Sequence, residues 1–152
     1  MKIDFGKPLI NHKEKKIVDK VLNSPILVHG KLMQKFESMF SKFTKAPFAI
    51  STSSCTAAMH LFYLALNLKA GDEVIVSSQT HVATAHAIEL TGAKPIFVDS
   101  NKEDGNIDIN KIEKKINNKT KAISIVHYLG VPVDMPKVLK LAKKYNLKEM
   151  ED

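Results

Sequence analysis

Small hydroxyl and thiol side chains gather at one point of the chain, where they could bind an anion. Residues 51–56 read Ser-Thr-Ser-Ser-Cys-Thr; they follow the apolar residues 48–50 and precede residues 59–68, whose apolar positions recur at helical spacing. A strand, a turn of small residues and a helix start together form a phosphate site, because the first helical turn has free N–H groups and a dipole that favours negative charge. The plainer interpretation is that Ser53 or Ser54 only caps the helix.

Strand and helix patterns alternate from this turn to the C-terminus. Continuous apolar runs predict strands and amphipathic periodicity predicts helices between them, which indicates a parallel sheet covered by helices on both faces. Parallel sheets bind ligands at the carboxyl ends of their strands, so the turns at residues 51–56, 77–81 and 99–100 are expected along one common edge. The predicted strands are residues 73–77, 94–99, 122–126 and 147 onward, and the predicted helices are residues 82–90, 109–116 and 135–145.

The N-terminal part of the chain is less informative. Residues 13–22 and 33–43 have the periodicity of two amphipathic helices, joined through a turn at residues 28–30. A polar turn at residues 101–106 lacks the ligand spacing and the terminal Glu of a calcium-binding EF-hand loop.

Composition favours a globular protein that binds neither nucleic acid nor membranes. The chain has 152 residues, which fits one domain, and a formal net charge of +7. Every basic residue is Lys, and the lysines are scattered along predicted helix faces, where solvated charge is the default. Arginine, the usual reader of phosphates and base edges, is absent. With 1 Cys, no secretory apolar region and no long apolar run, neither disulfides, export nor a membrane span is predicted.

Further motifs follow one another in a fixed order along nearly the whole chain. They are Gly71-Asp-Glu-Val-Ile, Gln79-Thr-His-Val-Ala-Thr-Ala-His-Ala-Ile, Gly92-Ala-Lys-Pro-Ile-Phe-Val-Asp, Val126-His-Tyr-Leu-Gly-Val-Pro-Val-Asp-Met135 and Met150-Glu-Asp152, with Gly30, Phe36 and Glu37 upstream. Together they resemble the DegT/DnrJ/EryC1/StrS family of pyridoxal-phosphate (PLP) enzymes, most of which are sugar aminotransferases of the aspartate aminotransferase fold. The resemblance implies an α/β fold: a three-layer sandwich with a mainly parallel sheet, the PLP-binding large domain.

The resemblance also implies which residues hold the cofactor. Thr56 and Ala57 match the turn whose backbone amides bind the PLP phosphate, and Cys55 stands where many members have Gly. His81 matches a position whose ring, usually aromatic, stacks on the pyridine; without the resemblance, a histidine capping the next helix is the plainer interpretation. Asp152 matches the carboxylate that pairs with the pyridinium nitrogen and keeps the ring an electron sink.

No catalytic residue is expected within the chain. Transamination requires a lysine that holds PLP as a Schiff base, and in the family this lysine follows the strand that bears the Asp. We therefore expect residues 1–152 to be a truncated PLP-binding domain, with a helical segment at 1–45 and an alternating α/β part at 46–152, inactive by itself. No metal is expected.

The implied full-length enzyme transfers an amino group, from glutamate, to a keto-sugar nucleotide in cell-surface polysaccharide or amino-sugar biosynthesis. It is expected to be a cytoplasmic homodimer. A sugar dehydratase of the same family and a catalytically inactive, partner-dependent binding module are the alternatives.

Three further residues are singled out without a chemical role. Glu149 stands where the family has an apolar strand residue, so its carboxylate would be costly if the site is buried. His127 and Asp134 belong to the fourth motif, and a structural role is at least as good an interpretation as a catalytic one. An unpaired strand edge at the C-terminal end is expected to promote association of the isolated chain.

Overall fold

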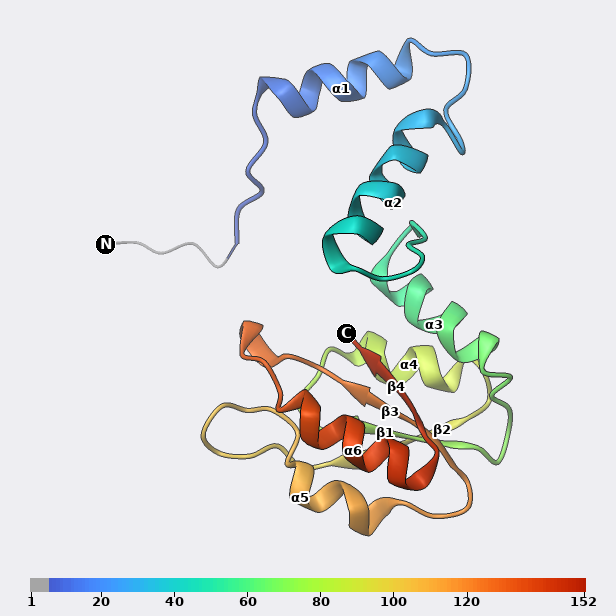
Figure 1. Ribbon diagram of the computed structural model, residues 1–152, viewed down its shortest axis with the longest axis vertical. Helices are drawn as coiled ribbons and strands as arrows, with labels where there is room; N and C mark the ends of the chain where they lie inside the picture. Colours follow the sequence, from blue (N-terminus) through green and yellow to red (C-terminus); the bar gives the residue numbers. More distant parts are fainter. Residues whose placement is uncertain (1–5) are drawn as a thin grey trace. The chain divides into compact units, whose positions relative to one another are not determined.

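The computed structural model describes residues 6–152 and divides into two compact units, one ending at Ser51 and the other spanning Thr52–Asp152 (Figure 1). The first unit contains helices α1 (His12–Leu22) and α2 (Lys31–Thr44). Asn11 begins α1 with a capping box: its side chain accepts from the Lys13 amide, and its own amide donates to Glu14. Both helices are amphipathic as predicted, yet neither has a buried residue.

The strand expected from the apolar residues 48–50 does not form. These residues have no strand assignment, and Phe48 and Ile50 are 83% and 82% exposed. An extended segment becomes a strand only when a neighbour takes its backbone hydrogen bonds, and no described strand pairs with this one. The segment is instead anchored at its end, because Glu37 of α2 accepts hydrogen bonds from the Ser51 amide and hydroxyl at 2.8 and 2.7 Å.

A parallel sheet forms the centre of the second unit. Its strands are β1 (Glu73–Ser77), β2 (Lys94–Val98), β3 (Thr120–Ile125) and β4 (Lys148–Glu151). They lie in the order β2-β1-β3-β4, and every adjacent pair is parallel. The strands predicted at residues 73–77, 94–99, 122–126 and 147 onward are thus all present, with boundaries shifted by at most two residues.

Helices cover both faces of the sheet, which confirms the three-layer α/β sandwich (Figure 1). Helices α3 (Cys55–Ala65) and α4 (Val82–Glu89) pack on one face, where Val74 and Val76 of β1 point. Helices α5 (Ile109–Ile112) and α6 (Met135–Tyr145) pack on the other face, against Ile75. The alternation of side chains along β1 therefore supplies both cores.

The short helix predicted at residues 109–116 is only partly correct. It is regular as α5, tightens into a 3₁₀ turn at Glu113–Lys115, and ends at Ile116, whose backbone is extended. The helix predicted to follow the turn at residues 51–56 begins at Cys55, as expected for a cap at Ser54, but it ends at Ala65 and not at Leu68, because Asn67 turns left-handed with φ 56°.

Glu149 lies in an exposed position of β4, so the cost of burying its carboxylate does not arise. Strand β4 is an edge of the described sheet, and only Met150 among its residues is buried. Over the described residues no helix is long and apolar enough to cross a membrane.

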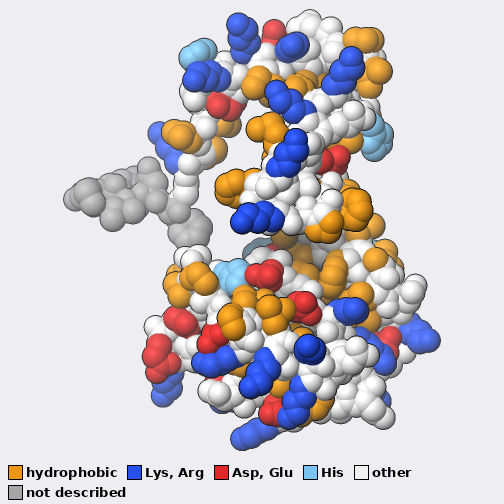
Figure 2. Space-filling model, in the orientation of Figure 1, with side chains coloured by type: hydrophobic (Ala, Val, Ile, Leu, Met, Phe, Trp, Pro, Cys, Tyr) orange, Lys and Arg blue, Asp and Glu red, His pale blue; other side chains and the backbone are white. Residues whose placement is uncertain are grey.

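On the face drawn in Figure 2, the lysines of the α/β unit do not gather in one basic patch. Figure 2 shows them spread over the surface of the α/β unit, interleaved with acidic side chains. On this face the distribution agrees with solvated helix surfaces.

Candidate functional site

The carboxyl ends of the strands bring together side chains that are far apart in sequence. The connection from β1 to β2 runs one way along the sheet, and the connection from β2 to β3 crosses to the other side of β1, so the strand order reverses between β1 and β3. Crevices at such reversal points are where open parallel sheets bind ligands. Ser77, the last residue of β1, and Ser100, which follows β2, have their hydroxyl oxygens 3.3 Å apart at this edge.

Asp152 is the centre of this cluster. Its amide donates to the Ile125 carbonyl at 2.8 Å, so it extends the pairing of β4 with β3 by one step. The Thr84 hydroxyl donates to Asp152 Oδ2 at 2.6 Å, and the Cys55 thiol donates to Asp152 Oδ1 at 3.2 Å. Each carboxylate oxygen therefore has a donor from the start of a different helix, α4 and α3.

The turn before α3 is a helix N-terminus, as predicted, but its amides are not equivalent. Ser54 is the N-cap, and its hydroxyl accepts from the Ala57 amide at 3.1 Å. Among the described residues, the amides of Cys55 and Thr56 have no hydrogen-bond acceptor. Helix capping and anion binding are therefore compatible at this turn. Ser54 occupies the Ala57 amide, and the amides of Cys55 and Thr56 remain available to an anion.

His81 is the N-cap of α4. Its ring Nδ1 accepts from the Ala83 amide at 3.1 Å, which places the proton of a neutral ring on Nε2. The ring is exposed beside the first turn of α4, the turn that also carries Thr84. Capping explains the local conformation, and stacking on a pyridine ring remains a prediction.

Thr80 and Thr84 belong to this cluster, although no role was predicted for them. The Thr80 hydroxyl donates to the Thr84 hydroxyl at 2.9 Å, and Thr84 is completely buried. Their spacing of four residues at the start of a predicted helix places two hydroxyls on one side of it. That spacing was a readable signal, but the acceptor, Asp152, is 68 residues from Thr84.

Cys55 is held as a neutral thiol. The hydrogen bond to the Asp152 carboxylate is the largest of the causes that raise the pKa of Cys55 above its ordinary value; partial burial and the negative charge of Asp152 add to it. A thiol of this kind is a weak donor and a poor nucleophile. Cys55 therefore fits a contact role better than covalent chemistry.

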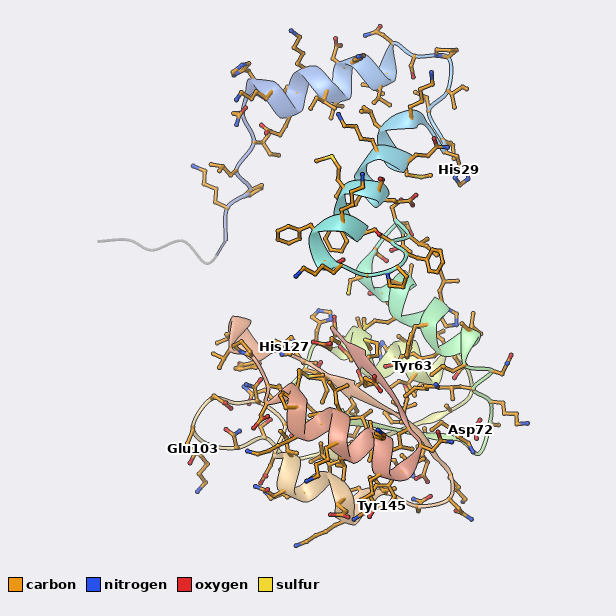
Figure 3. The ribbon with its side chains drawn as sticks, in the orientation of Figure 1. His29, Tyr63, Asp72, Glu103, His127 and Tyr145 are labelled. Atoms are coloured by element: carbon orange, nitrogen blue, oxygen red, sulfur yellow. The ribbon has the colours of Figure 1, made fainter. Side chains whose placement is uncertain are left out.

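His127 joins the end of β3 to β4. Its Nδ1 accepts from the Val133 amide at 3.1 Å, and its Nε2 lies 2.8 Å from Glu151 Oε2. Figure 3 shows His127 at the carboxyl end of the sheet and Asp72 at the opposite end. Asp134, its partner in the motif, is the N-cap of α6 and accepts from the Lys137 amide at 3.3 Å. Both residues thus have structural roles in positioning segments around the cluster.

Tyr63 lies fully buried behind the cluster with an unsatisfied hydroxyl. Neither the Tyr63 hydroxyl nor the buried Ser124 hydroxyl has a hydrogen-bond partner in the described part of the chain. Burial raises the pKa of Tyr63 to about 12; the nearby Ser124 hydroxyl lowers it in part, and the charge of Asp152 raises it. Tyr63 therefore stays neutral and belongs to the core below the site.

Two surface hollows of about 350 Å³ each lie away from this edge. One is lined by residues of α5, Glu113 and α6, and the other by residues around the amino ends of β1, β3 and β4. Within residues 6–152, no group of three or more His, Cys, Asp or Glu side chains could hold a metal ion. The candidate site is therefore the hydrogen-bonded cluster around Asp152.

The fold and the cluster define a class: a three-layer α/β protein with a helix N-terminus and a carboxylate at the carboxyl edge of its sheet. The chain belongs to the DegT/DnrJ/EryC1/StrS aminotransferase family, whose model matches residues 8–152. The cofactor of this family is PLP, and solved relatives contain it or its amine form, PMP.

Curated and solved relatives agree with this assignment. The chain is 45% identical to GDP-perosamine synthase of Escherichia coli O157:H7 over 151 residues, which is 99% of this chain and 42% of the relative. It resembles an aminotransferase from Psychrobacter cryohalolentis with a TM-score of 0.91 and 35% identity, covering 95% of this chain and 37% of the other.

A GDP-4-keto-6-deoxymannose-3-dehydratase with a trapped PLP-glutamate geminal diamine matches with a TM-score of 0.90 and 27% identity, covering 99% of this chain and 40% of the other. The chain thus spans about two fifths of the length of the relatives it matches.

The residues at this edge offer groups whose charges complement those of PLP: a helix N-terminus for an anion and a carboxylate for a protonated nitrogen. PLP carries a phosphate at one end and a protonatable ring nitrogen at another, and the cluster has a helix N-terminus and a carboxylate within one hydrogen bond of each other. Cys55, Thr56 and Ala57 form the first turn of α3, and Asp152 is the only carboxylate that touches this turn among the described residues.

Proposed function

We propose that the chain forms the PLP-binding part of an aminotransferase that acts on a keto-sugar nucleotide, with glutamate as the amino donor. The observation that carries this proposal is the Asp152 carboxylate, hydrogen-bonded by the first residue of α3 and by the first turn of α4 at the carboxyl edge of the sheet. Family membership supports the cofactor and the reaction class. The GDP-perosamine synthase relative supports a nucleotide-sugar substrate in amino-sugar or cell-surface polysaccharide synthesis.

Each residue at the edge has a part in binding and orienting the cofactor. The free amides of Cys55 and Thr56, with the dipole of α3, bind the phosphate, and Ala57 leaves room for it. The His81 ring, held by its cap to the Ala83 amide, would stack on the pyridine. Asp152 holds a proton on the ring nitrogen, because a carboxylate next to a protonated nitrogen favours the charged pair.

When bound, PLP supplies the electron sink that lets the amino group of one substrate be exchanged for the carbonyl oxygen of another. No residue of this chain is assigned to the lysine that carries PLP in transamination, and we propose that it is provided outside residues 1–152. We further propose that the enzyme works as a cytoplasmic homodimer.

A second candidate function is a sugar dehydratase, and the dehydratase relative favours it. Both enzymes use the same cofactor end of the site, so residues 1–152 do not separate them. A binding module without catalysis is the third outcome.

The deciding experiment uses the protein at the length of its relatives, mixed with PLP, glutamate and keto-sugar nucleotides, and identifies products by mass spectrometry. We expect an amino-sugar nucleotide and 2-oxoglutarate. Loss of water from the sugar without its amination would instead identify the dehydratase, and no product beyond a heat-denatured control would leave only the binding module.

The same assay also compares residues 1–152 alone with the protein at the length of its relatives. We expect residues 1–152 alone to give no turnover, because none of their lysines is assigned to carry PLP. Turnover by this chain above the heat-denatured control would overturn that expectation.

A further inference from the structure

The two oxygens of the Asp152 carboxylate are held in very different ways. Oδ2 accepts a 2.6 Å hydrogen bond from Thr84, whose side chain is completely buried. Oδ1 accepts from the thiol of Cys55, an exposed residue, at 3.2 Å. A hydroxyl bonded to a carboxylate is a strong, charge-assisted donor, whereas a thiol is a weak one. Oδ2 is therefore the fixed oxygen, and Oδ1 is the exchangeable one.

Thr84 has its single hydroxyl proton committed to Asp152. It accepts in turn from Thr80, at 2.9 Å, so the hydrogen bonds run in one direction from Thr80 through Thr84 to the carboxylate. A threonine in a helix often donates back to the carbonyl three or four residues earlier, but Thr84 donates across to β4 instead. Its branched side chain has few rotamers, which makes it a stiff support.

The backbone of Asp152 is fixed from another side. Its amide donates to the Ile125 carbonyl at the end of β3, which sets where the carboxylate leaves the sheet. The bonds to the backbone and to Oδ2 together restrain rotation of the carboxylate about its last bond. Oδ1 then has one direction, toward the start of α3, where Cys55 touches it.

We propose that Thr84, supported by Thr80, is a positioning residue that fixes Oδ2 of Asp152 and so presents Oδ1 to the ring nitrogen of the cofactor. The inference rests on the proposed function, because it assumes that the cofactor binds at this edge. When the ring nitrogen pairs with Oδ1, the Cys55 thiol gives up that oxygen. Thr84 acts through Asp152 and touches no reacting atom.

The test follows the ring nitrogen directly in the protein at the length of its relatives. Pyridoxamine 5′-phosphate labelled with ¹⁵N in the ring is titrated into the protein, and its affinity and its ¹⁵N chemical shift are recorded against pH. In the unmodified protein we expect the ring nitrogen to stay protonated well above the pH at which the free compound loses that proton. This readout needs no turnover.

Thr84→Val keeps the shape of the side chain and removes the hydroxyl. We expect affinity for the labelled compound to fall about 10-fold or more, the scale of one hydrogen bond to a charged group, and the ring nitrogen to lose its proton at a lower pH. Thr84→Ser restores the hydroxyl and should recover both readouts. Thr80→Val should move both in the same direction by a smaller amount, and it serves if Thr84→Val does not fold.

Thr91→Val is the matched control, a threonine at the other end of the same helix whose hydroxyl donates to the Ile88 carbonyl. It should leave the ¹⁵N titration unchanged. If Thr84→Val and Thr80→Val both titrate like the unmodified protein while Asp152→Asn lowers the pH of deprotonation, the positioning role of Thr84 is wrong and the proposed site stands. If the unmodified protein and Asp152→Asn titrate alike, or the compound does not bind, the proposed function itself fails.

Discussion

The two ends of the sheet show opposite ways of using polar side chains. At the amino end, Asp72 accepts from the Lys69 amide and Thr120 accepts from the Asn117 amide, each three residues away, and one longer bond runs from the Asn117 side chain to Glu73 across 44 residues. At the carboxyl end, Cys55 and Thr84 reach Asp152 across 97 and 68 residues. Local bonds shape turns, whereas a set of long-range bonds on one carboxylate fixes a position in space. The proposed site is at the carboxyl end, where these long-range bonds converge.

The difference between the two ends is tested most directly by replacing one carboxylate at each end and comparing the activities. In the protein at the length of its relatives, Asp152→Asn should lower kcat for amino transfer by about 100-fold or more, the scale of one preorganised electrostatic group. The amide has the same shape but cannot hold a proton on the ring nitrogen. Steady-state kinetics with glutamate and a keto-sugar nucleotide measure the loss.

The control is Asp72→Asn, whose carboxylate lies 3.9 Å from the Lys121 ammonium at the other end of the sheet. It should change kcat by no more than about twofold, as for most surface substitutions. Equal effects of the two substitutions would remove the distinction between the two ends.

Alanine substitutions at two glycines, one at each end of the sheet, test how tightly the two ends are packed. Gly105, in the turn after β2, has φ +76°, and a Cβ added there would lie 2.7 Å from the Tyr128 ring. Gly71, before β1, has φ +94° and open space around it. Gly105→Ala should lower the free energy of unfolding by about 2–4 kcal/mol through strain and overpacking, and Gly71→Ala by about 1–2 kcal/mol through strain alone.

Urea melts of both variants measure this difference. The turn that contains Gly105 is also tied to the segment after β3, because the buried Asn106 accepts from the Tyr128 amide and donates to the Val131 carbonyl. Equal losses in the two variants would mean that the Tyr128 ring moves aside without cost.

Tyr63, which is buried behind the cluster at the carboxyl end, should make the free energy of unfolding depend on pH. Its pKa is raised from 10.0 to about 12 in the folded protein, so its neutral form contributes stability that is fully present below pH 10 and is lost as the pH rises through 12. The free energy of unfolding of the unmodified protein, minus that of Tyr63→Phe, should therefore fall by roughly 1–3 kcal/mol over this interval.

At neutral pH, Tyr63→Phe should cost little or even stabilise, because the hydroxyl it removes has no partner. Urea melts of both proteins between pH 8 and 12 give the difference directly, since the deprotonation of lysines is common to both. A difference that does not change with pH would show that the Tyr63 hydroxyl reaches water.

The elements of the α/β unit could be predicted from sequence because their signals are local. Periodicity located every strand of the sheet, and Met135–Tyr145 was predicted to the residue, helped by Pro136 in its first turn. The strand at residues 48–50 was wrong because its formation depends on a neighbour that local sequence does not reveal. The apolar faces of α1 and α2 were read correctly, but their exposure depends on what covers them.

The candidate site was predictable only in part, for the same reason. Cys55, Thr56, Ala57, His81 and Asp152 were named from a family resemblance, and the contact of Cys55 with Asp152 is a fact of the fold. Thr80 and Thr84 carry a local signal, their spacing, that has no meaning until Asp152 is placed beside it. The roles of His127 and Asp134 became clear only from the structure: His127 links the end of β3 to β4, and Asp134 caps α6.

The extension of β4 by Asp152 has a consequence for the order of events during synthesis on the ribosome. At about 5–20 residues per second, roughly 5–20 s separate the appearance of Cys55 from that of Asp152, 97 residues later. The start of α3 can be capped by Ser54 as soon as that helix emerges. The carboxylate has no place until β4 has docked beside β3, so the nascent chain acquires one half of this cluster well before the other.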